Sequence, residues 1–512
     1  MNNFKKKLLD NSGIIVLFLL GLLLRAYCLG LRSFWYDEAV VLLEAQKNLI
    51  ALFHINSEGI HPPLYRLIMH FWLYLGQSEG VIRIPSLIFS SISIIVGYKI
   101  VKLIFNKRVA LYTALFITVS PFHIYYAQEV KSYSLFFLLS LASLYFFIKV
   151  TKENKIGLWL GYIFFTALSI YAHYFSFLSI FAQNLFLIFN YKRHEKGLLK
   201  KWVTAQCLVF LLFIPGLSAC VQHVRRVTGN FWIPPVSGEN IFIVFKNFTL
   251  GYYTSNFNFV FMQCLLGIIF LSGIRSLMFS RLNEQKSFYW ESSERLTLLL
   301  SYLSIPIIIL ALSKIIRPLF LDRALIVISF FYYIILSKGL EAMRKNKIIF
   351  FLVVFLSIIL VTVSLKNYYE QNNFSATVGV ASIKKQFREA MRYVSSNYRQ
   401  GDKVILSHYS SWPVFEYYRS QNTEIQLYLE NPFGCIDEDD KYSRVLLKYL
   451  NFRIINMDWF KEKENAGIWI ICSGWGDSPF VSSKLQEWMD AHRKYLSIKN
   501  DRFSGIKLYY FN

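Results

Sequence analysis

The sequence predicts a polytopic α-helical membrane protein with about eleven transmembrane helices and a C-terminal α/β domain. Hydrophobic residues make up 55% of the 512-residue chain and charged residues only 17%, whereas a soluble domain has about 25% charged residues. Apolar runs of roughly 20 residues, the length that crosses a bilayer, recur up to residue 365. After Lys366 the pattern changes to short apolar runs between polar helical segments.

Eleven apolar segments are the candidate spans. The first follows Lys5, Lys6 and Lys7 and lacks a small-residue cleavage site, so we expect an uncleaved anchor. The stretch 157–190 fits either one long tilted helix or two short helices that meet near His173. The candidate spans are 13–31, 82–101, 109–126, 133–150, 157–172, 174–190, 203–220, 257–279, 297–315, 321–338 and 348–365.

The distribution of charge predicts the topology. The net charge is +23, yet residues 370–512 contain 19 Lys and Arg against 17 Asp and Glu. The excess therefore lies in short clusters between the spans, which argues against nucleic acid as a partner. With eleven spans these clusters share one side, which the positive-inside rule identifies as the cytoplasm. The N-terminus is then cytoplasmic, and loops 32–81 and 221–256 and the C-terminal tail lie outside.

The chain divides into a transmembrane part, 1–368, and an extracytoplasmic tail, 369–512. In the tail, Val404–Leu406 and Gly467–Cys472 read as buried strands, and 383–398 and 483–496 as helices. Strands that alternate with helices predict a small α/β domain. Its two cysteines, Cys435 and Cys472, could form one disulfide, but the spacing between them does not indicate one. The chain has no Gly-rich phosphate loop and no internal repeat.

The first outer loop begins with the run Trp35-Tyr36-Asp37-Glu38. Two adjacent carboxylates at a membrane surface suit a general base, because a neighbouring acid and partial desolvation tune the affinity for a proton. A helix N-cap followed by a first-turn acid explains the same residues without any catalytic role. The motif alone leaves both interpretations open.

Other polar residues recur at the predicted outer ends of spans. They include His61 and Tyr65 in His-Pro-Pro-Leu-Tyr, and Gln128, Lys131 and Tyr133 after Ser120-Pro121; Gln128 and Lys131 would share a helix face. His173 is an ionisable residue between two spans. Arg317 and Arg323, and similarly Arg83, could hold a phosphate through paired N–H groups. Turns, solvated loops and interfacial ion pairs are the alternatives for each.

The order of these motifs resembles the GT-C superfamily of membrane glycosyltransferases that use polyprenyl-phosphate sugars. The similarity covers about residues 30–340 and is greatest to the protein O-mannosyltransferase-like group, glycosyltransferase family 39, with bacterial aminoarabinose transferases as cousins. The shared series is Trp-x-Asp-Glu, His-Pro-Pro-Leu-Tyr, Arg-x-Pro-Ser, Ser-Pro with a Gln-Glu-x-Arg-x-Tyr run, and a late Arg. Lys131 stands where that run usually has Arg, so the charge is kept and the guanidinium fork is lost.

The resemblance implies an inverting glycosyltransferase of the plasma (inner) membrane. Asp37 would be the general base, and Glu38 would orient it or help bind the acceptor. His61, Tyr65, Arg83, Gln128, Lys131, Tyr133, His173 and Arg323 would bind substrate or the donor phosphate. The partners would be a polyprenyl-phosphate-linked sugar, an acceptor protein, lipid or glycan, and membrane lipids.

Two other functions fit the composition: a lipid-linked sugar flippase and a non-catalytic envelope assembly protein. A flippase needs cations along a path through the bilayer, whereas the candidate residues gather at one side. The Asp37–Glu38 pair argues against a purely structural protein. The sequence requires no metal, although it leaves a divalent ion open, and it specifies neither the sugar nor the acceptor.

Overall fold

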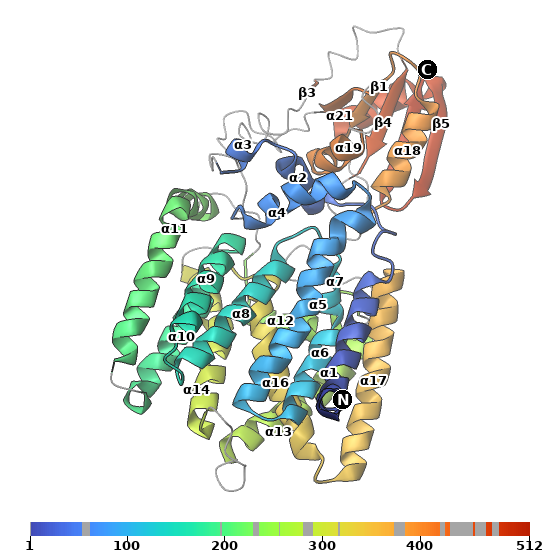
Figure 1. Cartoon of the computed structure of the whole chain (residues 1–512). Helices are drawn as coiled ribbons and strands as arrows, with labels where there is room; N and C mark the ends of the chain where they lie inside the picture. Colours follow the sequence, from blue (N-terminus) through green and yellow to red (C-terminus); the bar gives the residue numbers. More distant parts are fainter. Residues whose placement is uncertain are drawn as a thin grey trace. The chain divides into compact units, whose positions relative to one another are not determined.

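A computed structural model describes residues 2–53, 62–194, 197–228, 235–254, 256–279, 290–315, 318–372, 384–419, 425–430, 454–455, 467–473 and 481–512. These residues form two compact units (Figure 1). The first unit comprises Met1–Cys28, Ile60–Tyr65 and Arg83–Ala381. The second comprises Leu29–Gly59, Arg66–Ile82 and Ser382–Asn512, so it joins the tail to most of the predicted first outer loop.

The first unit is a bundle of apolar helices (Figure 1). Each of the eleven predicted spans coincides with a helix or a pair of helices. These are α1 (Asn2–Ala26), α5 (Glu79–Ile104), α6 (Lys107–Val119) with α7 (Pro121–Ala127), α8 (Tyr133–Val150), α9 (Ile156–Ala172), α10 (Ser176–Asn190), α11 (Leu198–Thr228), α13 (Asn256–Phe279), α14 (Ser292–Leu303) with α15 (Ile305–Ile315), α16 (Ile326–Met343) and α17 (Lys347–Glu370). One further helix, α12 (Glu239–Leu250), precedes α13.

By length and composition, seven helices in the described part of the chain can cross a membrane, or eight if α6 and α7 form one bent span. Two shorter apolar helices are Asn11–Ala26 and Ile156–Ala172. The polytopic helical class predicted from the sequence is therefore confirmed. The ambiguous stretch 157–190 forms two helices, α9 and α10, that meet at His173.

The bend of 58° between α6 and α7 has a local cause. Pro121 has no N–H to donate to the carbonyl of Ile117, and the side chain of Ser120 caps α7 by accepting from the N–H of His123. The buried guanidinium of Arg25 donates instead to the carbonyl oxygens of Ile117 (2.9 Å) and Thr118 (3.1 Å). An apolar environment makes such substitute donors necessary.

Helices α13 and α16 approach closely because each carries a glycine at the contact. A Cβ atom on Gly273 would lie 2.2 Å from the carbonyl oxygen of Ile335, and one on Gly339 would lie 2.0 Å from that of Ile269. Small residues allow this backbone approach in membrane helices.

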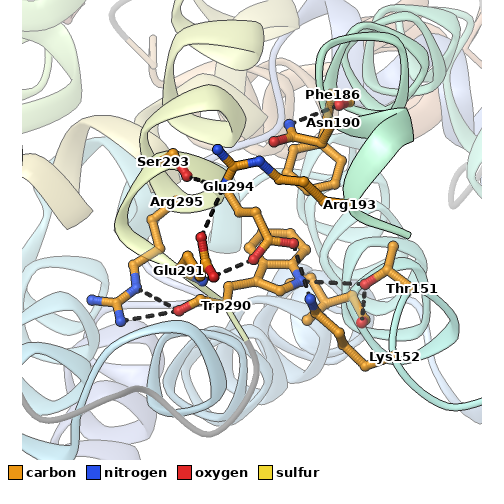
Figure 2. A network of polar contacts seen from close by, with 11 residues as sticks. Thr151, Lys152, Phe186, Asn190, Arg193, Trp290, Glu291, Ser293, Glu294 and Arg295 are labelled. Carbon is orange, nitrogen blue, oxygen red and sulfur yellow. Dashed lines mark hydrogen bonds and ion pairs between the residues drawn. The ribbon is translucent and has the colours of Figure 1, made fainter. Parts of the chain in front are cut away.

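A polar network lies at the far end of α8 from Tyr133 (Figure 2). Lys152 forms an ion pair with the buried Glu294 at 3.0 Å, and the indole of Trp290 donates to Thr151 Oγ1 at 3.2 Å. Glu294 and Glu291 together form a capping box at the start of α14. Lys152, Arg193 and Arg295 come from three different basic segments between the predicted spans, and all three contribute to this network.

The second unit contains α2 (Tyr36–Ala45), α3 (Leu49–Phe53), most of α4 (Leu64–Trp72) and the tail domain. The tail elements are α18 (Phe387–Asn397), β1 (Lys403–Leu406), α19 (Trp412–Arg419), β2 (Leu427–Glu430), β3 (Ile454–Ile455), β4 (Ile468–Cys472), α21 (Ser483–Ala491), β5 (Leu496–Phe503) and β6 (Ile506–Phe511). The predicted α/β domain is confirmed, with both expected strands present and the expected helices corresponding to α18 and α21. Helix α21 is shorter than expected, because it ends at Ala491 and Leu496 already begins β5.

The tail sheet has the strand order β3-β2-β1-β4-β6-β5, parallel from β3 to β4 and antiparallel from β4 to β5. The central strand β4 is fully apolar and buried, and β1 is so apart from its first residue, Lys403, as expected for strands covered on both faces. One core cluster joins Ile405, Ile470 and Cys472 to Leu485 of α21 and Phe511 of β6. Cys472 is a free thiol, and Cys435 lies outside the described residues.

Candidate active site

The first cluster of candidate residues lies in the helical unit, at neighbouring ends of α8, α9 and α16. The ring of Tyr133, the first residue of α8, lies 5.8 Å from the guanidinium of Arg323 and 5.6 Å from the ring of His173. Lys131 stands two positions before Tyr133, in the turn that leads into α8. All four side chains are buried. We call Lys131, Tyr133, His173 and Arg323 the cationic cluster.

A chain of contacts connects two further motifs to this cluster. The hydroxyl of Tyr65 is hydrogen-bonded to Ser86 Oγ at 2.7 Å, and Ser86 Oγ approaches the carbonyl oxygen of Lys131 at 3.5 Å. Arg83 lies one turn before Ser86 on α5 and is 1% exposed. The His-Pro-Pro-Leu-Tyr, Arg-x-Pro-Ser and Gln-Glu-x-Lys-x-Tyr motifs therefore meet, although they lie far apart in sequence. His61 itself falls outside the described residues.

Gln128, three positions before Lys131, forms hydrogen bonds with residues of α1 and α17 and with the segment after α1. Its amide nitrogen donates to the carbonyl oxygens of Arg25 (2.8 Å) and Tyr27 (2.7 Å), and its amide oxygen accepts from the hydroxyl of Tyr368 (2.7 Å). This one side chain thus ties α1, the end of α7 and α17 together. These bonds favour a bracing role for Gln128 over direct contact with a phosphate.

One local prediction for this region is wrong. Gln128 and Lys131 do not share a helix face, because α7 ends at Ala127 and α8 begins at Tyr133. The residues between them form turns and bends. The non-helical backbone is buried within protein, the setting in which membrane proteins tolerate such segments.

The structure adds residues that the motif search did not single out. Asp322, directly before Arg323, accepts from the amide of Asn247 at 2.7 Å and from the backbone N–H of Arg323 at 2.6 Å. Lys246 is also buried and lies within electrostatic reach of Asp322. Glu129, between Gln128 and Lys131, is a buried carboxylate. The sequence did offer a sign of Glu129, because this acid stands inside the Gln-Glu-x-Lys-x-Tyr motif.

The second group of candidates lies in the other unit, at the start of α2. Trp35 occupies the N-cap position without a side-chain cap, and Asp37 and Glu38 stand in the first turn. The interpretation of the acid pair as first-turn residues is therefore correct locally, whereas neither acid is the cap. Carboxylates in a first turn are stabilised by the helix dipole.

The two acids differ in their surroundings. Glu38 is completely buried and forms an ion pair with Lys384 at 3.3 Å. Asp37 is partly exposed. A general base must reach its substrate, so Asp37 is the better candidate of the two for proton transfer.

No group of three or more His, Cys, Asp or Glu side chains suited to a metal occurs among the residues with a described placement. Arg317 also lies outside those residues.

Comparisons with known proteins agree with this description. Residues 60–218 match the family model of dolichyl-phosphate-mannose-protein mannosyltransferases. The crystal structure of ArnT from Cupriavidus metallidurans bound to undecaprenyl phosphate matches with a TM-score of 0.58 at 10% identity, over 98% of both chains. A search of curated protein sequences gives no match.

Archaeoglobus fulgidus provides two similar structures. Its oligosaccharyltransferase in the apo form matches with a TM-score of 0.53 at 11% identity, over 91% of this chain and 70% of that one. The oligosaccharyltransferase AglB in complex with an inhibitory peptide and a dolichol-phosphate gives 0.50 at 11% identity, over 91% and 69%. At such identities the likeness concerns the fold, which extends over nearly the whole chain.

Proposed function

We propose that this chain, which has the fold of the GT-C superfamily of membrane glycosyltransferases, transfers a sugar from a polyprenyl-phosphate donor to an acceptor. The observation that carries the proposal is the placement of Arg323 over the ring of Tyr133, which also contacts His173, with the buried Lys131 two positions before Tyr133. Two buried cations in an apolar bundle suit an anion attached to a lipid, because the bundle can accommodate the polyprenyl chain beside its phosphate. The similar structures with undecaprenyl phosphate and dolichol-phosphate support the same ligand class.

The reaction we propose is an inverting displacement. An acceptor hydroxyl or amine loses its proton to Asp37 as it attacks the anomeric carbon of the sugar. The new bond forms while the bond between that carbon and the phosphate oxygen breaks, and the bonding electron pair leaves with the phosphate. The product is the glycosylated acceptor with polyprenyl phosphate.

The cations supply electrostatic stabilisation. Negative charge builds on the phosphate as it leaves, and Lys131, Arg323 and Arg83 would oppose it. Fixed charges in a dry site contribute more than they would in water. The phosphate is a good leaving group and needs no strong general acid. We place the reaction at the outer face of the plasma membrane, following the basic clusters that indicate the cytoplasmic side.

The proposal is tested with purified full-length protein in detergent. A panel of undecaprenyl-phosphate sugars is incubated with an envelope extract from the source cells, and released undecaprenyl phosphate is measured by mass spectrometry. We expect release from at least one donor by the wild type and a loss of about 10²–10⁴-fold in Asp37→Asn. Equal release by both proteins would contradict the role of Asp37, and sugar movement across vesicles without bond cleavage would indicate a flippase.

A further inference from the structure

The buried acid of the Asp37–Glu38 pair is neutralised by a residue almost 350 positions away. Lys384 stands just before α18, and its Nζ lies 3.3 Å from Glu38 Oε2. The side chains of Glu38 and Lys384 are 0% and 3% exposed. Both residues belong to the same compact unit.

Helices α18 and α19 of the tail also bond to the residues that lead into α2. Arg388 of α18 donates to the carbonyl oxygens of Gly30 (3.3 Å) and Leu31 (3.0 Å), and Ser33 Oγ donates to Glu389 at 2.9 Å. The backbone N–H of Phe34 donates to the hydroxyl of Tyr418 in α19 at 2.8 Å. The segment 30–34, directly before the acid pair, is thus bonded to α18 and α19.

A second ion pair reinforces this attachment. Arg388 also contacts Glu79 at 3.0 Å, and the hydroxyl of Tyr418 donates to Glu79 at 2.8 Å. Arg388, Glu389 and Tyr418 therefore hold the segment that leads into α2 through hydrogen bonds. The position of the first turn of α2 depends on the tail.

We propose that Lys384 is a positioning residue for the catalytic acid pair, so that the tail domain is a working part of the active enzyme. The inference rests on the proposed function of Asp37. Glu38 cannot reach a substrate while it is fully buried, and its charge needs a partner to remain there. Lys384 supplies that partner and holds the first turn of α2, which leaves the neighbouring Asp37 partly exposed as the carboxylate that takes the proton.

The charge of Lys384 has a second consequence. Two adjacent carboxylates repel each other, which favours protonation of one of them. A cation on Glu38 cancels much of that repulsion. Without it, the pair would hold a proton to higher pH, and the acid limb of the activity profile would move upward.

The test uses full-length protein with the variants Lys384→Ala, Lys384→Arg, Glu38→Gln and the double variant Lys384→Met/Glu38→Gln. Lys385→Ala is the matched control, because Lys385 is an adjacent, equally buried lysine. Turnover of an undecaprenyl-phosphate sugar is measured against pH. Hydrogen–deuterium exchange of the α2 peptide gives a readout that needs no substrate.

We expect Lys384→Ala to lower kcat about 10–100-fold, to shift the acid limb to higher pH and to speed exchange in α2. Lys384→Arg restores most activity, Lys385→Ala resembles the wild type, and the double variant resembles Glu38→Gln, because coupled residues are not additive. If Lys384→Ala is poorly folded, the double variant carries the test, since a neutral pair leaves no buried charge.

The proposal is overturned if Asp37→Asn is inactive while Lys384→Ala keeps wild-type turnover, pH profile and exchange. Additive effects in the double variant would overturn it as well. Activity retained by Asp37→Asn would instead refute the proposed function, whatever the Lys384 series shows.

Discussion

The guanidinium of Arg323 lies 5.8 Å from the centre of the Tyr133 ring. These residues are 190 positions apart, one at the start of α8 and the other just before α16. A cation over an aromatic face is held by the ring quadrupole, and more strongly in a desolvated setting. The contact holds the guanidinium of Arg323 beside the ring of Tyr133, within the cationic cluster.

Two substitutions of Tyr133 distinguish the effect of its ring on phosphate binding from the effect of its hydroxyl. Tyr133→Phe keeps the ring and should bind undecaprenyl phosphate as the wild type does. Tyr133→Leu removes the quadrupole and should weaken binding about 5–30-fold, corresponding to about 1–2 kcal/mol for a desolvated cation–π contact. Titration of undecaprenyl phosphate into purified protein measures both. Equal weakening by Phe and Leu would assign the effect to the hydroxyl instead.

Lys131 tests the departure from the usual motif. Lys131→Ala should weaken undecaprenyl phosphate binding about 10–100-fold, since a charge-assisted hydrogen bond contributes about 1.5–3 kcal/mol. Lys131→Arg should retain binding and could improve it through the guanidinium fork. Lys131→Gln, which keeps length without charge, should behave like Ala. Identical affinities across the series would remove Lys131 from the phosphate site.

The topology is open to a direct test. With eleven spans and the basic clusters inside, the C-terminus lies outside the cytoplasm. Alkaline phosphatase fused after Asn512 should be active, and a cytoplasm-dependent fluorescent reporter at the same point should be dark. The opposite pair of results would contradict both the span count and the outer-face assignment.

The tail should lose stability in mild acid. Burial lowers the pKa of His408 to about 4, and the charge of Lys385 acts in the same direction. The unfolded chain therefore binds a proton that the folded domain does not, between about pH 6.5 and pH 4. The stabilising contribution is complete above pH 6.5 and declines as the pH falls toward 4.

The measurement is hydrogen–deuterium exchange of β1 and β4 in the full-length protein at pH 7 and pH 5, after correction for intrinsic rates. In the wild type, His408 Nδ1 accepts a hydrogen bond from the backbone N–H of Ser410 at 3.1 Å. The variant His408→Asn keeps an acceptor for that N–H. We expect the pH-dependent loss of protection to shrink in this variant. An unchanged loss would show that another group titrates.

Much of this architecture follows from local pattern. Apolar runs of bilayer length predicted the long helices of the bundle, although the single predicted span 109–126 is broken at Pro121 into α6 and α7. The tail strands were visible because Val404–Leu406 and Ile468–Cys472 are continuous apolar runs. The ordered motifs predicted that Tyr65, Lys131, Tyr133 and Arg323 belong to one site, and His173 was a candidate because it is an ionisable residue between two spans. That these residues share one chemistry is still a prediction.

The long-range pairs did not follow from the sequence. Lys384 has no local feature that connects it to Glu38, and nothing in the first predicted span, 13–31, indicates that Arg25 within it bonds to α6. Nor did the pattern show that the first outer loop folds with the tail, because the division was drawn where the composition changes. Such pairings depend on tertiary packing.

The central claim, sugar transfer with Asp37 as base, is tested most directly by one comparison. Wild type and Asp37→Asn are matched for folding and for binding of undecaprenyl phosphate, and each is then assayed for release of that lipid from an undecaprenyl-phosphate sugar with acceptor present. The account predicts intact binding in Asp37→Asn and turnover reduced about 10²–10⁴-fold. Wild-type turnover in Asp37→Asn would contradict it.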